Sequence, residues 1–175
     1  KGVGAFYVNS ELKNILKPLI HGGGQEYKIR SGTVPTPLAV GMGEAAARII
    51  QYLDQNNKQA LECKKHFYEI MHQSIKNIEI NGCENERIDH NLNLRIPKVE
   101  AEKLIINTPG VAFSSGSACT SGEIQSSHVL RSMGLSDQEA RESFRISFSH
   151  LTTIENAANA AEQIVNSARK ILKYE

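Results

Sequence analysis

The segment Phe144-Arg145-Ile146-Ser147-Phe148 alternates strictly between apolar and polar residues. A period of two is the pattern of a β-strand with one buried and one open face. Phe144, Ile146 and Phe148 are predicted to face a core, whereas Arg145 and Ser147 face the other side. We therefore expect a sheet here, with a packed core on one face only.

Helix signals lie on both sides of this strand. Ser136 and Glu139 have the spacing of a capping box, and Thr152 and Glu155 repeat that spacing at the start of a terminal helix. The apolar residues of the terminal helix recur at helical spacing: Ile154, Ala158, Ala161, Val165, Ala168 and Leu172. A sheet covered by helices is the expected α/β architecture.

The rest of the chain adds further elements. Apolar residues at helical spacing predict one long helix from Thr36 to Asn77, which continues through the polar run at 54–58. Strands are expected at 3–8, 78–80, 92–96 and 111–113, and shorter helices at 10–19, 99–106 and 126–133. We expect two parts, residues 1–53 and residues 54–175, of which the second is a compact α/β unit.

Composition excludes several classes of function. Hydrophobic residues make up 40% of the 175 residues and charged residues 22%, which is typical of a globular protein. A formal net charge of +1 gives no electrostatic reason to expect binding to nucleic acid or to a membrane. No apolar run approaches the roughly 18 residues of a membrane span. The sequence predicts a soluble, cytoplasmic protein.

The three cysteines favour free thiols. Cys63, Cys83 and Cys119 lie too far apart for a CxxC metal site, and an odd count is a poor disulfide framework. Cys119 lies in the small, polar stretch 114–122, where a thiol can be exposed and can move, although a buried cysteine is the commoner case. Cys63 and Cys83 are interpreted as structural residues, and no metal site is expected.

Two other features suggest binding chemistry. Arg145, on the open face of its strand, suits a carboxylate that it can grip with two hydrogen bonds, although a surface arginine or an internal salt bridge is the more ordinary interpretation. The loop formed by 20–26 and 30–33 is rich in glycine and can cradle a phosphate, but a plain turn is equally consistent with its pattern.

Taken together, several motifs resemble cysteine desulfurases of the NifS/IscS group. They occur in the family's order: Gly2-Val3-Gly4-Ala5-Phe6-Tyr7-Val8, His21-Gly22-Gly23-Gly24-Gln25-Glu26, Arg30-Ser31-Gly32-Thr33, Gly41-Met42-Gly43-Glu44-Ala45 and Ser114-Ser115-Gly116-Ser117-Ala118-Cys119-Thr120-Ser121. The last motif points to the subgroup with a long cysteine loop. The resemblance implies a fold-type I pyridoxal-phosphate enzyme of the class V aminotransferase family. Residues 1–53 would then end its large cofactor-binding domain, and residues 54–175 would form its small C-terminal domain.

The resemblance also implies roles for particular residues. Cys119 matches the nucleophile that takes sulfur from L-cysteine as a persulfide and leaves L-alanine. Arg145 matches the arginine that binds the substrate carboxylate. Thr33 matches the threonine that reaches the cofactor phosphate of the neighbouring subunit in a homodimer. Five further residues match positions that line the active site: His21, Gly22, Gly23, Gly24 and Arg30.

One departure concerns the cofactor lysine, which in the family lies in a Ser-x-His-Lys motif just before the segment that begins this chain. Lys1 matches a different lysine, that of a Gly-Pro-Lys-Gly turn. The 175 residues alone are therefore expected to be inactive, because most of the pyridoxal-phosphate site would lie upstream. Phe148-Ser149-His150, in place of the more usual Leu-Gly-Arg, leaves the subfamily open.

The implied function is sulfur supply for Fe–S clusters and for tRNA thiolation, with an Fe–S scaffold protein and other sulfur acceptors as partners. Two alternatives remain open. A selenocysteine lyase or another class V enzyme would share the fold, although an aminotransferase has no need of Cys119. A non-catalytic dimerisation or docking module would function equally well with Cys119 replaced by serine.

Overall fold

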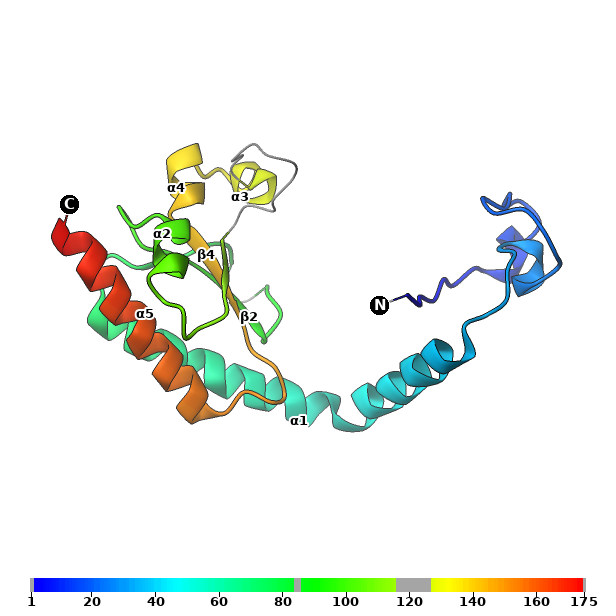
Figure 1. Ribbon diagram of the computed structural model, residues 1–175, viewed down its shortest axis with the longest axis horizontal. Helices are drawn as coiled ribbons and strands as arrows, with labels where there is room; N and C mark the ends of the chain where they lie inside the picture. The colour runs from blue at the N-terminus through cyan, green and yellow to red at the C-terminus, as the bar shows by residue number, and fades with distance from the viewer. Residues whose placement is uncertain (1, 84–85, 116–126, 175) are drawn as a thin grey trace. The chain divides into compact units, whose positions relative to one another are not determined.

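The computed structural model describes residues 2–83, 86–115 and 127–174. Two compact units divide the chain, Lys1–Leu53 and Asp54–Glu175, and each is described by itself. The elements of the second unit that follow its first helix are shown in Figure 1, and in chain order they are β1 (Glu79–Ile80), β2 (Asn91–Arg95), α2 (Ala101–Ile106), β3 (Ser114–Ser115), α3 (His128–Ser132), α4 (Asp137–Arg141), β4 (Ser143–Ser147) and α5 (Ile154–Tyr174).

An antiparallel sheet with strand order β1-β2-β4-β3 forms the centre of this unit. The central pair is β2 with β4, whose five residues are all in register from Asn91 opposite Ser147 to Arg95 opposite Ser143. The sequence expectation of strands at 78–80, 92–96 and 144–148 is confirmed to within one residue at each end.

One face of the sheet is buried, as the alternation of residues 144–148 predicts. Phe144, Ile146 and Phe148 are buried, whereas Arg145 and Ser147 are exposed. Leu92 and Leu94 of β2 lie on the same buried face, next to Ile146 and Phe144 in the register. Burial of such side chains is the main favourable term in folding, at about 1.5–3 kcal/mol each.

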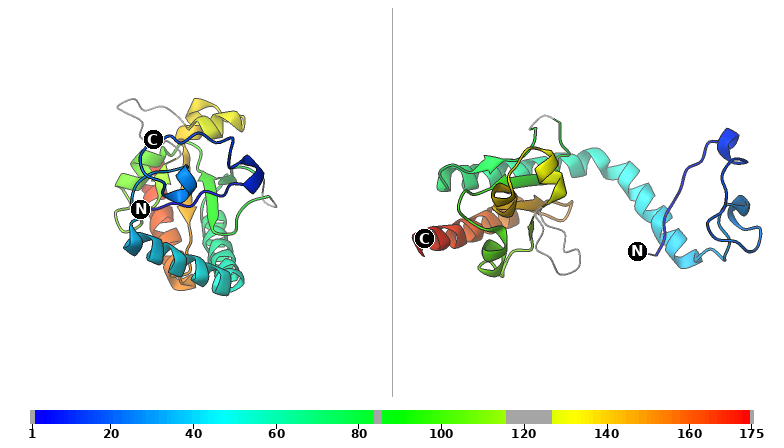
Figure 2. Two further views of the ribbon diagram at one scale, coloured as in Figure 1. Left: turned by 90° about the vertical axis from the view of Figure 1, so that its right-hand side faces the viewer. Right: turned by 90° about the horizontal axis from the view of Figure 1, so that it is seen from above.

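Two helices cover that face (Figures 1 and 2). The first is α1 (Thr36–Ser74), a continuous helix of 39 residues, so the polar run at 54–58 does not end it. Within the second unit α1 buries Ala60, Cys63, Phe67 and Met71, which recur every three or four residues. The ring of Phe67 meets that of Phe148 edge to face, with centroids 5.6 Å apart.

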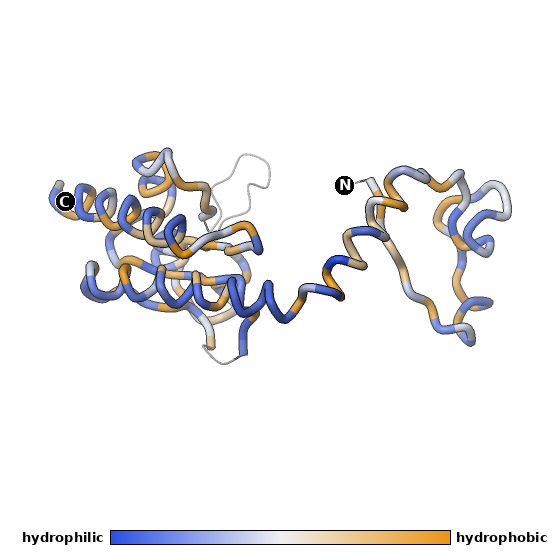
Figure 3. Tube along the Cα trace, turned by 90° about the horizontal axis from the view of Figure 1, so that it is seen from below, coloured by the Kyte–Doolittle hydropathy of each residue, from blue (hydrophilic) through white to orange (hydrophobic). Residues whose placement is uncertain are grey.

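The second covering helix, α5, begins differently from the sequence prediction. Thr153, not Thr152, caps it, because the Thr153 hydroxyl accepts a hydrogen bond from Asn156 N at 3.1 Å. The Thr152 hydroxyl instead accepts from Ser149 N at 3.0 Å, within the turn after β4. Small and β-branched side chains form the buried stripe of α5: Ala157, Ala161, Ile164, Val165 and Ala168. Figure 3 shows hydrophobic and hydrophilic residues alternating along this helix, which ends at the C mark.

The prediction of a strand at 111–113 is wrong. Val111 N donates to Thr108 O in a turn, and Phe113 packs its ring edge to face against Phe144 at 5.5 Å. The strand is the next pair of residues, Ser114 and Ser115, which lie opposite Arg145 and Phe144. The apolar residues 111–113 therefore contribute contacts to the core, and the polar residues Ser114 and Ser115 form the strand that pairs with β4.

Side-chain caps fix the short helices near the sheet. Ser136 and Glu139 form the predicted capping box of α4, with the Ser136 hydroxyl accepting from Glu139 N and the Glu139 carboxylate accepting from Ser136 N. Ser127 caps α3, and Gly134 follows that helix at φ +96°, a conformation that favours glycine. Across the residues that the structure describes, no helix has the length and hydrophobicity needed to cross a membrane.

In the first unit the predictions for residues 3–8 and 10–19 are wrong. Residues 2–9 adopt no regular secondary structure, and the expected helix shrinks to a 3-10 turn, η1 (Ser10–Leu12). Phe6 and Tyr7 are 78% and 88% exposed, so neither side chain packs on a neighbouring strand. Local pattern alone does not stabilise a strand or a short helix without a packing partner.

The core of the second unit depends on Phe67. Replacing Phe67 by alanine is expected to lower the free energy of unfolding by about 3–5 kcal/mol, because a fully buried ring leaves a cavity. Ile106→Ala is the matched control on an exposed side chain and is expected to cost less than about 0.5 kcal/mol. Urea titrations followed by circular dichroism measure both. Equal losses in the two variants would contradict the packing described here.

Candidate functional site

Arg145, which the sequence analysis singled out, lies on the open face of the sheet. Arg145 is exposed on β4, with Asn93 of β2 opposite it on one side and Ser114 of β3 opposite it on the other. Residues opposite one another in an antiparallel ladder point to the same face. Arg145 therefore lies in a row of three polar residues, with neutral side chains as its two direct neighbours.

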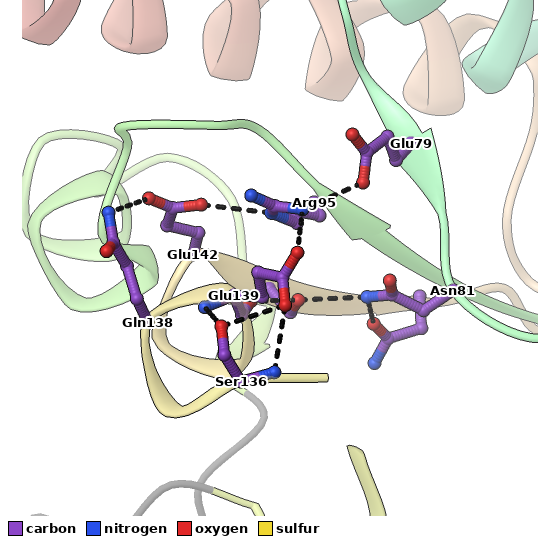
Figure 4. Close-up of polar contacts among 9 residues, drawn as sticks. Glu79, Asn81, Arg95, Ser136, Gln138, Glu139 and Glu142 are labelled. Carbon is purple, nitrogen blue, oxygen red and sulfur yellow. Dashed lines mark hydrogen bonds and ion pairs between the residues drawn. The ribbon is translucent and has the colours of Figure 1, made fainter. Parts of the chain in front are cut away.

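A second arginine on this face has a different environment. Arg95 contacts three carboxylates, Glu139 at 2.7 Å, Glu142 at 2.9 Å and Glu79 at 3.0 Å (Figure 4). Burial acts to lower the pKa of Arg95, but the hydrogen bond that Arg95 donates to Glu142 and the surrounding negative charges outweigh it, so the pKa is raised. Arg95 therefore has a structural role, because its ion pairs join β2 to β1 and to α4.

Asn81, next to β1, extends this polar network into the interior. Its side chain is buried, and its Nδ2 donates to Asn93 Oδ1 at 2.7 Å and to Ser143 Oγ at 2.9 Å. The guanidinium of Arg87 donates to Asn81 O at 2.7 Å and so holds the turn after β1. The sequence analysis missed Asn81 and Asn93. The sequence signal that could have identified Asn93 is the alternation of polar residues with leucine in β2. This alternation places Asn91, Asn93 and Arg95 on one face of the strand.

Cys119 lies outside the described residues, within the segment 116–126. The residues that flank this segment are described. Before it, Ser114 and Ser115 pair with β4 at Arg145 and Phe144. After it, the Ser127 hydroxyl accepts from Leu130 N at the start of α3. The last described residues before Cys119 therefore lie on the strand beside Arg145.

Of the other two cysteines, Cys63 is buried, as the structural interpretation expected, whereas Cys83 is exposed, contrary to it. Cys63 is completely buried, and its thiol donates to Thr152 O at 3.4 Å. Burial, and to a lesser extent the charge of Glu62, raises the pKa of Cys63, which makes it a poor nucleophile. Cys83 is exposed just after Gly82, whose φ of +88° marks a turn. Among the described residues no cluster of histidine, cysteine and acidic side chains is arranged to hold a metal ion.

In the first unit the two glycine-containing motifs form one loop. Ile20 and Arg30 form a parallel bridge, the Ser31 hydroxyl donates to Gly23 O at 2.9 Å, and Gly32 N donates to Gln25 Oε1 at 3.3 Å. A Cβ at Gly22 would lie 3.1 Å from the Ser31 side chain, a tight contact that a larger residue could make only if Ser31 shifted slightly.

The chemistry of this loop fits a phosphate group. Thr33 is exposed and offers a hydroxyl, and Arg30 is a half-buried residue whose Nη1 donates to Gly32 O at 2.8 Å. Gly32 lies between them at φ +113°, which leaves its backbone open to a close approach. Beside the loop is a hollow of about 1050 Å³, whose lining includes Val3, Phe6, Tyr27, Arg30, Pro35 and Met42. His21, Gly23 and Gly24 belong to the same exposed loop.

Comparison with known proteins places the chain in a family. The sequence model of the aminotransferase class-V family matches residues 1–159. The chain belongs to that family, and it has the α/β fold of fold-type I pyridoxal-phosphate enzymes, as the sequence resemblance predicted.

The similar proteins include cysteine desulfurases. The chain is 39% identical over 171 residues to the cysteine desulfurase IscS of Pseudomonas putida strain W619, covering 98% of this chain and 42% of that protein. It is 40% identical to the IscS of Ehrlichia chaffeensis, covering 97% of this chain and 42% of that protein. These identities confirm the resemblance to the NifS/IscS group. The chain spans about two fifths of the length of these curated relatives.

Solved structures agree with this assignment. A NifS-like protein from Rickettsia africae superposes with a TM-score of 0.73 at 27% identity, over 90% of this chain and 40% of that chain. DndA from Streptomyces lividans gives a TM-score of 0.60 at 34% identity, over 76% of this chain and 37% of that chain. The fold is therefore shared across relatives that differ widely in sequence.

The carboxylate cluster around Arg95 makes stability depend on pH. Hydrogen bonds from the backbone and the hydroxyl of Ser136, together with Arg95, lower the pKa of Glu139 below its ordinary value. Because folding favours the ionised form, this stabilisation is present above the ordinary carboxyl pKa and is lost as the pH falls through the lowered pKa. The difference in unfolding free energy between wild type and Glu139→Gln should therefore be largest at neutral pH and should shrink on acidification.

Unfolding titrations at a series of pH values measure this difference. Ser136→Ala removes the hydroxyl that donates to the Glu139 carboxylate. The pKa of Glu139 should then be lowered less, so this variant should lose less stability on acidification than the wild type. A difference between wild type and Glu139→Gln that stays constant from neutral to acid pH would contradict the assignment.

Proposed function

We propose that the full-length protein is a cysteine desulfurase that moves the sulfur of L-cysteine onto Cys119. Membership of the class V family and 39% identity to IscS proteins over nearly the whole chain support this proposal. The structural observation that carries it is the register of β3 with β4, in which Ser114 lies opposite Arg145. The segment that contains Cys119 thus begins beside a strand arginine suited to a carboxylate.

Chain geometry allows the two groups to serve one substrate. Cys119 is four residues beyond Ser115, so its Cα lies at most about 14 Å from that of Ser115. L-Cysteine has a carboxylate at one end and a thiol at the other. A substrate held at its carboxylate by Arg145 therefore presents its sulfur in the region that Cys119 can reach.

The proposed reaction is a sulfur transfer between two thiols. The thiolate of Cys119 attacks the substrate sulfur, a new S–S bond forms, and the bond between that sulfur and the substrate Cβ breaks. Pyridoxal phosphate, when bound, supplies the electron sink for the pair left on carbon. Protonation of that carbon yields L-alanine, and Cys119 is left as a persulfide. Arg145 holds the carboxylate in place throughout.

The loop of the first unit has a complementary role in the proposal. Thr33 would bind the cofactor phosphate, which in a homodimer belongs to the site of the neighbouring subunit, and Arg30 would line that site. His21 and the triplet Gly22, Gly23 and Gly24 would line that site. In this proposal residues 1–53 end the large cofactor-binding domain, and residues 54–175 form the small domain that carries Cys119.

The proposal extends to the destination of the sulfur. A persulfide on Cys119 can be passed to another thiolate, so the partners would be an Fe–S scaffold protein and other sulfur acceptors, including those that thiolate tRNA. The free thiols of Cys63 and Cys83 suit the reducing cytoplasm, where we place the protein.

Replacing Cys119 by serine tests the sulfur carrier. Cys119→Ser in the full-length protein should abolish sulfide release from L-cysteine, because a hydroxyl does not accept the sulfur. Cys83→Ser is the matched control on an exposed cysteine and should keep wild-type turnover. Assays of alanine, and of the sulfide that an added thiol reductant releases from the persulfide, measure both products. Equal turnover in wild type and Cys119→Ser would contradict the persulfide mechanism and favour a lyase.

Replacing Arg145 by lysine tests the carboxylate site. Lysine keeps the positive charge but loses the planar pair of donors, so the KM for L-cysteine should rise about 10- to 100-fold in Arg145→Lys. Steady-state sulfide release over a range of L-cysteine concentrations measures the change. An unchanged KM would remove Arg145 from the site.

A further inference from the structure

Asn93 lies in a position that brings its side chain close to that of Arg145. Just beyond the two ends of the β2–β4 pair, Phe148 N donates to His90 O and Ile96 N donates to Glu142 O. In an antiparallel ladder, hydrogen-bonded pairs alternate with non-hydrogen-bonded pairs. The pair Asn93–Arg145 is three positions from each of these bonds and is therefore of the non-hydrogen-bonded kind. Its Cα atoms lie about 4.5 Å apart, the closer of the two spacings.

A path of hydrogen bonds fixes which way the amide of Asn93 faces. The path starts at Glu139 O, a carbonyl that only accepts, so the Ser143 hydroxyl donates its proton there at 2.7 Å. Ser143 Oγ must then accept from Asn81 Nδ2, and the same amide group donates to Asn93 Oδ1. Figure 4 labels two members of this path, Asn81 and Glu139.

The oxygen of the Asn93 amide is therefore already used as an acceptor toward Asn81. Its Nδ2, which carries two protons, is the part of the amide that the bond to Asn81 leaves available, on the half-buried face that Asn93 shares with Arg145. Asn93 can therefore offer a hydrogen-bond donor to a ligand bound on that face. A hydrogen-bond donor next to a guanidinium does not occupy any of its N–H groups. Both groups can therefore donate to the same anion and together bind it more tightly.

The contrast with Arg95 strengthens this interpretation. Arg95 lies on the same face, two residues along β2, and three carboxylates compensate its charge. The two residues directly opposite Arg145, Asn93 and Ser114, are both neutral. The chain therefore supplies an anionic environment to one arginine of this face and a neutral, donor-rich environment to the other.

We propose that Asn93 is a second carboxylate-binding residue, whose amide N–H donates to the same substrate carboxylate that Arg145 binds. Asn81 is a positioning residue, because it holds the amide of Asn93 in the orientation that presents the donor. This inference rests on the proposed function and adds to it a specificity element: selection of an amino acid with a free carboxylate.

Asn93→Asp is the sharpest test. The aspartate keeps an oxygen for Asn81 but places a second oxygen, with negative charge, next to Arg145 and the substrate carboxylate. The KM for L-cysteine in the full-length protein should rise about 10- to 100-fold through this repulsion, with kcat changed less than about threefold. Asn91→Asp is the matched control, since it adds the same charge to the same strand face two pairs further along, opposite Ser147. It should raise KM clearly less than Asn93→Asp, because its charge lies about 7 Å further along the strand.

The separation of KM from kcat distinguishes binding from damage to the fold. A loss of folded protein lowers apparent kcat and leaves KM unchanged, so such a result in Asn93→Asp would overturn the proposal. Asn81→Asp provides an independent variant: an acceptor at position 81 should turn the amide of Asn93 around, present its oxygen to the substrate and raise KM, although Asn93 and Arg145 themselves are unchanged. Equal KM values in Asn93→Asp, Asn91→Asp and wild type would also overturn the proposal.

Calorimetric titration with L-alanine separates this inference from the proposed function. If the wild-type protein releases no sulfide, the desulfurase assignment fails, but L-alanine still supplies a carboxylate. Weaker binding of L-alanine by Asn93→Asp than by Asn91→Asp would then support a carboxylate site at Asn93. Equal binding by the two variants would refute it.

Discussion

The antiparallel register between β2 and β4 is the constraint on which the rest of this unit depends. It places Leu94 beside Phe144 on one face, where α1 and α5 complete the core, and Asn93 beside Arg145 on the other. A shift of one residue in that register would bury Arg145 and expose Phe144. Core packing and the proposed carboxylate site are therefore two consequences of one pairing, and the hydrophobic core holds the polar face in its geometry.

The open face uses two arginines in different ways. Arg95 is enclosed by Glu79, Glu139 and Glu142 and ties α4 to the sheet, so its charge serves stability. Arg145 has neutral residues opposite it on both sides. Such a difference in the surrounding charges distinguishes a structural cation from one that is available to a ligand. The buried path through Asn81 and Ser143 connects the two environments.

The sequence alone predicted much of the second unit, because its signals are local and periodic. Alternation at 144–148 predicted both the buried phenylalanines and the open position of Arg145, and the spacing of Ser136 and Glu139 predicted their capping box. The failures have physical causes. Residues 3–8 and 10–19 have strand-like and helix-like patterns but lack packing partners in their unit, and the apolar residues 111–113 supply core contacts instead of a ladder. The Arg95 cluster and the Asn81–Asn93 bond join residues 12 or more positions apart, so no local pattern reports them. The chemistry of Cys119 was predicted from family motifs, and Cys119 itself lies outside the described residues.

The central claim is that sulfur from L-cysteine becomes attached to Cys119 beside a carboxylate site on β4. Mass spectrometry of peptides from the full-length protein, after incubation with L-cysteine and blocking of free thiols, tests it most directly. The account predicts one added sulfur atom on the peptide that contains Cys119, greatly reduced in Arg145→Ala, and none on the peptides that contain Cys63 or Cys83. Added sulfur on Cys83 in place of Cys119, or equal loading of Cys119 with and without Arg145, would contradict it.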